Sequence, residues 1–346
     1  MPIRAEFKPD KIYIIGTSES QWELLQGIDY KKILIPAGNS EQDFWEMMDI
    51  LSKEIDLSHS EVAFDITHCF RTIPFFVVIF IRFMKFFDET AEIKHIFYAN
   101  IESKEIIDLK PLLDLLDWID ATSIFLNSGE LENLCSLVAK AERETGAKEK
   151  KEKPNHLKNL RRIMKELAAI TQMTYVPQFG EISKSLADLL SDENFELEAR
   201  NQLKPLYYLM PKIREMLDKF KAESEWETQL KIASWYLENK KPSQALIVLR
   251  EAIITQQCLK ANKDPYDTKQ RSQIEEELNK AVKAESKMEI HKLWDKVSQH
   301  RNKVAHALMR RRENIDPEKA IRTTWNYLKE AFEVMTGMTE RSHHEN

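Results

Sequence analysis

The chain has 346 residues, more than one ordinary domain needs, and this length predicts two or three domains. It is 42% hydrophobic and 31% charged, a globular composition that excludes disordered, collagen-like and membrane-bundle proteins. The net charge is −6, from 51 Lys and Arg against 57 Asp and Glu. A protein that coats nucleic acid through its overall field is usually strongly basic, so any contact with RNA or DNA is expected in a local pocket.

The first 110 residues alternate between strand-like and helix-like patterns. The predicted strands are Lys11–Thr17, Lys31–Ala37, Glu61–Thr67 and Ile93–Ile101, with a short fifth at Glu105–Leu109. Helices are expected between them at Ser18–Gln26, within Gly38–Ile55 and at Phe75–Phe87. The alternation predicts an α/β, Rossmann-like domain with a parallel-rich sheet and helices on both faces. Ligands of such sheets bind beyond the carboxyl ends of the strands.

After Pro111 the strand patterns nearly stop, and the rest of the chain is predicted to be an all-α helical bundle. Helices are expected through 155–221 and then at Glu225–Asn239, Pro242–Ala261, Gln270–Ala284, Lys287–Arg312 and Pro317–Thr336. Lys148–Lys153, KEKKEK, is expected to be a solvated break or an exposed helix end. We therefore predict a ligand-sensing domain at 1–120, a helical connector at 121–224, a helical domain at 225–340 and a tail at 341–346.

Cysteine usage and the apolar segments favour a cytoplasmic protein. The three cysteines, Cys69, Cys135 and Cys258, are far apart and odd in number, which predicts neither a disulfide framework nor a Cys-type zinc site. The N-terminus lacks the apolar core of a signal peptide. The most apolar run, Ile73–Phe87, is 15 residues long and too short to span a bilayer, so it predicts a buried helix and no membrane partner.

The loop after the first strand is GTSES, Gly16–Ser20. A glycine that ends a strand, followed by the hydroxyls of Thr17 and Ser18 at a helix N-terminus, can hold an anionic phosphate. The alternative is a simple turn with a helix cap.

The loop after the third strand is DITHCFRTIP, Asp65–Pro74. Here Arg71 can pair with a phosphate, while Thr67 and His68 can bond a ribose or a base edge. The alternative is an ion pair between Asp65 and Arg71, with Thr67 capping the next helix. No second cluster of ligands supports a metal site.

A third motif, HRNKVAH at His300–His306, lies on one predicted helix. Asn302 and His306 are about 40° apart on it, whereas Arg301 is about 140° from His306, near the apolar arc. An arginine there must be paired or face a partner, because a lone buried charge is costly. Lys287–Arg312 holds eight Lys and Arg against two acidic residues, a candidate phosphate surface. The alternative is a solvated basic helix.

Together these motifs resemble a known family. IIGTSESQW, FDITHCFRTIP and YANIESKEIIDLKPLLDLLDW resemble the CARF domain, the CRISPR-associated Rossmann-like fold. Cys69 stands where the Thr-His-Gly-Phe-Arg loop of this family has its glycine, which affects the backbone shape at that position. The second half is similar to a HEPN domain, whose mark is Arg-x4–6-His, here carried by Arg301, Asn302 and His306. The resemblance covers about 1–120 and 225–340.

The resemblance implies an accessory ribonuclease of type III CRISPR systems. Such proteins are homodimers in which the CARF pair binds a cyclic oligoadenylate and the HEPN pair cleaves single-stranded RNA without metal or cofactor. The implied product is a 2′,3′-cyclic phosphate. The implied catalytic residues are Arg301, Asn302 and His306. The expected activator contacts are Gly16, Thr17, Ser18, Thr67, His68, Arg71 and Asn100.

A ligand on the dimer axis binds best if it shares the two-fold symmetry, which favours an even-membered ring. The resemblance alone favours cyclic tetra-adenylate over cyclic hexa-adenylate. An alternative from a different class stays open. The protein would then be a nucleotide-sensing regulator without nuclease activity, binding its ligand in the α/β half and acting on a partner through its helices.

Overall fold

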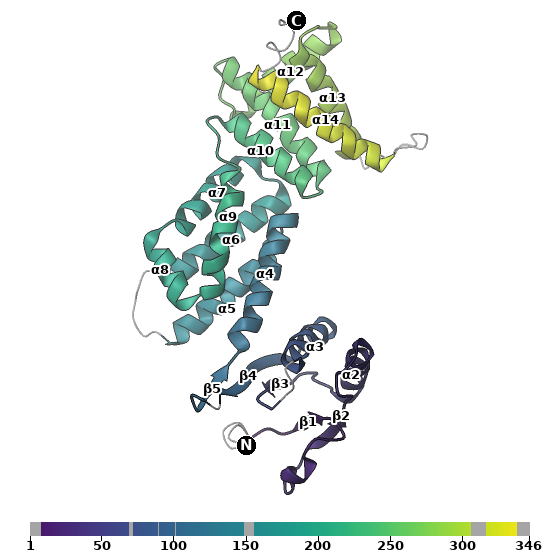
Figure 1. Ribbon diagram of the computed structural model, residues 1–346. Coiled ribbons are helices and arrows are strands. Elements are labelled where there is room, and N and C mark those ends of the chain that lie inside the picture. The colour runs from purple at the N-terminus through teal and green to yellow at the C-terminus, as the bar shows by residue number, and fades with distance from the viewer. Residues whose placement is uncertain are drawn as a thin grey trace, which may run out of the picture. The chain divides into compact units, whose positions relative to one another are not determined.

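The computed structural model describes residues 8–68, 72–88, 90–100, 102–148, 156–305 and 316–337 (Figure 1). The chain divides into two compact units, 1–116 and 117–346. All described strands lie in the first unit, and the second is helical. An α/β part followed by a helical part agrees with the expectation from the sequence. The finer division at 120 and 224 stays a prediction.

The described residues of the first unit form two small sheets, where the sequence predicts a single one. Its elements are β1 (Tyr13–Gly16), η1 (Trp22–Leu25), β2 (Lys31–Leu34), α2 (Glu41–Glu54), β3 (Glu61–Asp65), α3 (Ile73–Phe87), β4 (Glu92–Asn100) and β5 (Glu105–Asp108). β1 pairs with β2 in parallel, while β3 pairs in parallel with β4, which pairs antiparallel with β5. Among the described residues no ladder joins β1 to β3, so a continuous Rossmann-like sheet stays a prediction.

Helix α3 connects the apolar cores of these two sheets. Phe80 packs in one cluster with Ile33 of β2 and Met47 of α2. Ile81, one residue later and therefore about 100° around the helix, packs with Ile96 of β4. One face of α3 is thus buried in both cores, but Phe75, Phe86 and Phe87 are exposed, so the prediction of a buried helix is confirmed only in part.

The helix expected at Ser18–Gln26 is reduced to the single 3-10 turn η1, and that prediction is wrong. A local side-chain turn replaces the first helical turn, because the Ser20 hydroxyl accepts a hydrogen bond from the Thr17 N–H at 3.0 Å. Gly27 then adopts a left-handed φ of 82°, which ends the segment. Serine side chains compete with helical backbone bonds in this way.

The helices of the second unit share one apolar core, whose buried members run from Trp118 to Met335. They are α4 (Lys110–Ser128, which begins in the first unit), α5 (Glu132–Lys148), α6 (His156–Met173), α7 (Val176–Leu190), α8 (Glu193–Gln202), α9 (Lys204–Asp218), α10 (Glu225–Glu238), α11 (Pro242–Lys260), α12 (Thr268–Lys283), α13 (Glu289–Ala305) and α14 (Pro317–Thr336). Residues 306–312 of the helix expected at Lys287–Arg312 lie outside the described residues.

Helix α14 shows why the predicted ends are accurate for the helices that follow Glu225. The Asp316 carboxylate caps its N-terminus by accepting bonds from the backbone N–H groups of Glu318 and Lys319. Pro317 occupies the first turn, and Gly337 ends the helix with a φ of 73°. No helix in the described part of the chain has both the length and the apolarity to cross a bilayer.

Candidate functional site

The loop after β1 is a compact turn closed by its own side chains. The Trp22 indole N–H donates to the Thr17 carbonyl at 2.9 Å, and the Thr17 N–H donates to Ser20 Oγ. A Cβ on Gly16 would lie 2.8 Å from Ser20 Oγ and 2.9 Å from Trp22 Cζ2, so only glycine fits without a shift. The Thr17 N–H is therefore occupied, while Ser18 is exposed at the tip and available to a ligand.

The loop after β3 is fastened to β4 through Thr67. Its hydroxyl oxygen accepts a hydrogen bond from the Ala99 N–H at 2.9 Å, and its own N–H donates to Asp65 Oδ1 at 2.9 Å. Thr67 does not cap α3, because the cap residue of that helix is Thr72, so the alternative expected for Thr67 is wrong. His68 follows on the exposed surface. Arg71 and Cys69 lie outside the described residues.

Asn100 ends β4, next to the Ala99–Thr67 hydrogen bond. Its side-chain oxygen accepts hydrogen bonds from the N–H groups of Glu102 at 2.9 Å and Ser103 at 3.3 Å. Both hydrogen bonds to the Asn100 side-chain oxygen therefore stabilise the turn before β5. The Asn100 amide NH₂, which donates in neither bond, can donate to a ligand.

The two groups of predicted activator contacts lie in different sheets. Thr67 and Asn100 are brought together at the end of the β3–β4 pair, whereas Gly16, Thr17 and Ser18 follow β1 in the other sheet. That these groups form one pocket with Arg71 stays a prediction.

On α13, Arg301 is half-buried and has no ion pair with any residue that the structure describes. Its Nη1 donates to the Asn302 side-chain oxygen at 3.3 Å, and its Nε is buried without a hydrogen-bond partner. Asn302 itself is exposed. His306 lies outside the described residues. A guanidinium with an unsatisfied donor and no counter-charge is suited to bind an anion such as a phosphate.

His300, the residue before Arg301, was not selected from the sequence as a site residue. Its ring packs perpendicular to Tyr327 of α14, with centroids 5.8 Å apart, and its Nε2 is buried without a partner. Burial lowers the pKa of His300 below its ordinary 6.5, and the positive charge of Lys303 lowers it further, against a hydrogen bond with the Ala320 backbone. His300 thus contacts α14 in its neutral form at neutral pH. The sequence carries no sign of this packing contact, because it depends on where the fold places Tyr327.

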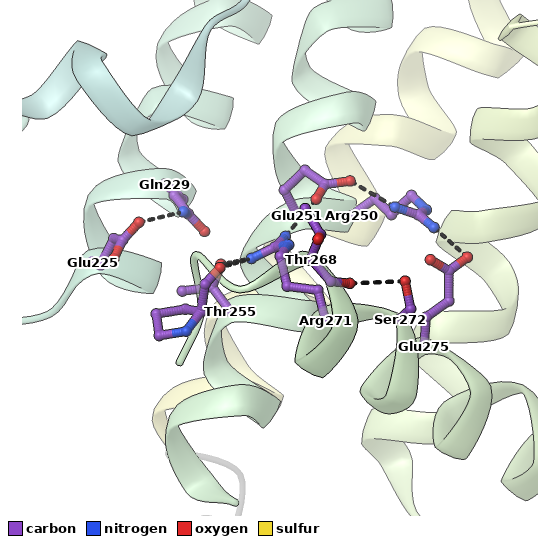
Figure 2. A network of polar contacts seen from close by, with 10 residues as sticks. Glu225, Gln229, Arg250, Glu251, Thr255, Thr268, Arg271, Ser272 and Glu275 are labelled. Carbon is purple, nitrogen blue, oxygen red and sulfur yellow. Dashed lines mark hydrogen bonds and ion pairs between the residues drawn. The ribbon is translucent and has the colours of Figure 1, made fainter. Parts of the chain in front are cut away.

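A network of charged side chains fixes the helices around α13 (Figure 2). Arg250 of α11 donates to Glu251 at 2.6 Å and to Glu275 of α12 at 2.5 Å, and its guanidinium lies 5.1 Å from the ring centre of Trp294 on α13. Arg271 bonds the second oxygen of Glu251 at 2.5 Å. Each charge of the network is matched by an opposite one. The network therefore has a structural role, holding α12 and α13 against α11.

Metal ligands do not gather in the described part of the chain, where no group of three or more His, Cys, Asp or Glu is placed to hold an ion. The two described cysteines, Cys135 and Cys258, are buried free thiols.

No protein-family model matches this sequence. A curated protein of Methanocaldococcus jannaschii, named CRISPR-associated protein MJ1674, is 26% identical to it over 312 residues. The chain is similar to a CRISPR-associated protein. The match covers 86% of this chain and 45% of the relative, so the chain spans less than half of the length of that protein. Since neither compact unit is 312 residues long, the similarity extends over parts of both.

Proposed function

We propose that the protein is a cyclic-oligoadenylate-activated, metal-independent endoribonuclease that cleaves single-stranded RNA in type III CRISPR antiviral defence. The observation that carries the proposal is Arg301, a half-buried guanidinium with no counter-charge among the described residues, beside Asn302 in a basic helix. The similarity to a CRISPR-associated protein supports the biological setting.

The chemistry needs few groups. The 2′-hydroxyl of a ribose attacks the adjacent phosphorus, the bond to the 5′-oxygen breaks, and a 2′,3′-cyclic phosphate and a 5′-hydroxyl result. A base must take the 2′-hydroxyl proton and an acid must return one to the leaving oxygen. In this proposal Arg301 stabilises the charge on the phosphorane oxygens and Asn302 orients the phosphate. His306 exchanges the protons, and two copies across a dimer axis would supply both base and acid.

The proposed state is a homodimer, and the surface of α3 supports it. Phe75, Ile79, Phe83 and Phe86 lie within an arc of about 80° on this helix. Phe75 is 74% exposed and Phe86 is 82% exposed. A row of large apolar side chains on the outside of a small unit is typical of an interaction surface. A second copy packed on this face would cover the row and place two sets of strand-end loops about one axis.

The activator is proposed to bind at these strand-end loops. Ser18 and His68 are exposed there, and the Asn100 amide NH₂ has no acceptor among the described residues. Arg71 would supply the bidentate phosphate contact that a ring of adenylates requires. Cyclic tetra-adenylate is the first choice and cyclic hexa-adenylate the second.

The deciding experiment adds each cyclic oligoadenylate to the protein and a fluorescent single-stranded RNA in EDTA. Activated cleavage is expected, and it should be lost in Arg301→Ala and His306→Ala while activator binding is retained. Removing one stabilising donor typically lowers the rate by about 10²–10³-fold, and Asn302→Ala should lose less than Arg301→Ala because Asn302 carries no charge. Binding of the activator without cleavage would favour the sensor without nuclease activity. Cleavage that disappears in EDTA and returns with manganese would contradict the metal-independent mechanism.

A further inference from the structure

Two basic stretches stand out in this acidic chain. Lys148–Lys165 and Lys287–Arg312 together hold 16 of the 51 Lys and Arg but only 4 of the 57 Asp and Glu. The second stretch includes α13 and the proposed nuclease residues. The first runs from the end of α5 into α6, and the proposed function assigns it no role.

The basic residues of α6 gather on one face of the helix. At 100° per residue, Lys158, Arg161, Arg162 and Lys165 fall within an arc of about 100° and extend over about 10 Å of helix axis. The buried residues of α6 lie on the opposite side, and they are Leu157, Leu160, Ile163, Met164, Leu167, Ile170 and Thr171. Glu166, the one acidic residue of α6, lies about 40° beyond Arg162 at the edge of the basic arc. The helix therefore presents a mainly cationic face away from the core.

The surface beside this face is open to solvent. An open depression of about 550 Å³ lies against Lys158, Asn159, Arg161, Arg162 and Lys165, and no acidic residue is among the described residues that line it. Both arginines form ion pairs at the edge of this face. Arg161 pairs with Glu142 of α5 at 2.6 Å, and Arg162 pairs with Glu166 at 3.2 Å. Lys165 is exposed and forms no ion pair with a described residue.

We propose that this α6 face binds the phosphate backbone of the single-stranded RNA substrate, away from the bond that is cleaved. The inference rests on the proposed function. Four cations over about 10 Å, of which Arg161 and Arg162 are each paired on one side with a glutamate, present the repeating positive charge that successive phosphates require. The Asn159 amide adds a donor that bonds phosphate oxygens or bases. None of the described lining residues is an apolar one that would insert into a membrane or pack on a protein partner. Such contacts add affinity without selecting sequence.

The test is RNA affinity as a function of salt, measured by fluorescence anisotropy. The variant combines Lys158→Glu, Arg162→Glu and Lys165→Glu, leaving Arg161 with its partner Glu142, and the Arg301→Ala substitution prevents cleavage. The control combines Lys184→Glu, Lys204→Glu and Lys269→Glu, which change the net charge equally at exposed lysines of other helices. Circular dichroism confirms that both variants fold.

Each phosphate contact contributes about 0.7 to the slope of log affinity against log salt for a single strand. The α6 variant should therefore lose about 2 from that slope and at least about tenfold in affinity for a long unstructured RNA at 0.1 M salt. The control should lose far less. A short oligonucleotide that covers only the cleavage site should bind both variants alike.

Equal affinities and slopes in the α6 variant and the control would overturn the inference, and so would failure of the unsubstituted protein to bind RNA. An equal loss for duplex DNA would also overturn it, by assigning the surface to duplex nucleic acid. Cleavage is measured separately in proteins that keep Arg301. If these proteins cleave RNA when the activator is added, but the α6 face does not bind RNA, this inference fails and the proposed function stands. Binding of RNA through α6 without cleavage would reject the nuclease and keep the surface.

Discussion

Replacing Arg250 with methionine should destabilise the helical unit without creating a cavity, because methionine keeps most of the aliphatic stem. The side chain of Arg250 is 15% exposed, and three interactions are lost with its guanidinium. These are the bonds to Glu251 and Glu275 and the contact with the Trp294 ring. Glu251 keeps its bond to Arg271, so it is not left as an unpaired buried charge.

The expected loss follows from these contacts. A hydrogen bond to a charged group contributes about 1.5–3 kcal/mol, and the cation–π contact about 0.5–2 kcal/mol. The bond to Glu275 is discounted, since that carboxylate is 40% exposed and regains water. We expect Arg250→Met to lower the free energy of unfolding by about 2–4 kcal/mol. For a unit of this size the unfolding midpoint should fall by about 5–15 °C.

The assay is urea unfolding followed by the helical circular-dichroism signal, with Arg322→Met as the matched control. Arg322 is 69% exposed and lies 4.0 Å from Asp316, so its loss should change stability by less than about 0.5 kcal/mol. A decrease below about 1 kcal/mol for Arg250→Met, or one equal to that of the control, would refute the structural role of the network.

Three further predictions concern the two candidate sites. Arg71→Ala should shift the activator titration of RNA cleavage to higher concentration by orders of magnitude while the plateau is kept; coincident curves would show that the activator does not contact Arg71. In thermal unfolding, Gly16→Ala should lower the free energy of unfolding by about 1–3 kcal/mol, because the new Cβ clashes with Ser20 and Trp22. The control Ser18→Ala should leave the free energy of unfolding unchanged. Because the folded state lowers the pKa of His300, the unfolded state binds its proton first as the pH falls below 6.5, and stability is lost with acidification. His300→Gln should therefore lose less stability between pH 7 and pH 5 than the unsubstituted protein in urea titrations, and parallel losses would contradict this.

The local sequence determined the helices from Glu225 onward closely. Proline in the first turn and an acidic cap set the start of α14 at Pro317, and the pattern ended at Thr336, where the structure ends it. These signals act between residues close in the sequence, so they can be read without knowledge of the fold. The strand ends and their loops were likewise located from the apolar runs.

Strand pairing and side-chain partners were decided only by the tertiary structure. Thr67 bonds Ala99, 32 residues away, and Arg250 meets Glu275 and Trp294 from two other helices. No local pattern specifies such contacts, because they depend on which elements pack together. The same reason applies to Arg301. The sequence placed it near the apolar arc of its helix, but only the packed structure shows that no described carboxylate reaches it and that its Nε is buried without a hydrogen-bond partner.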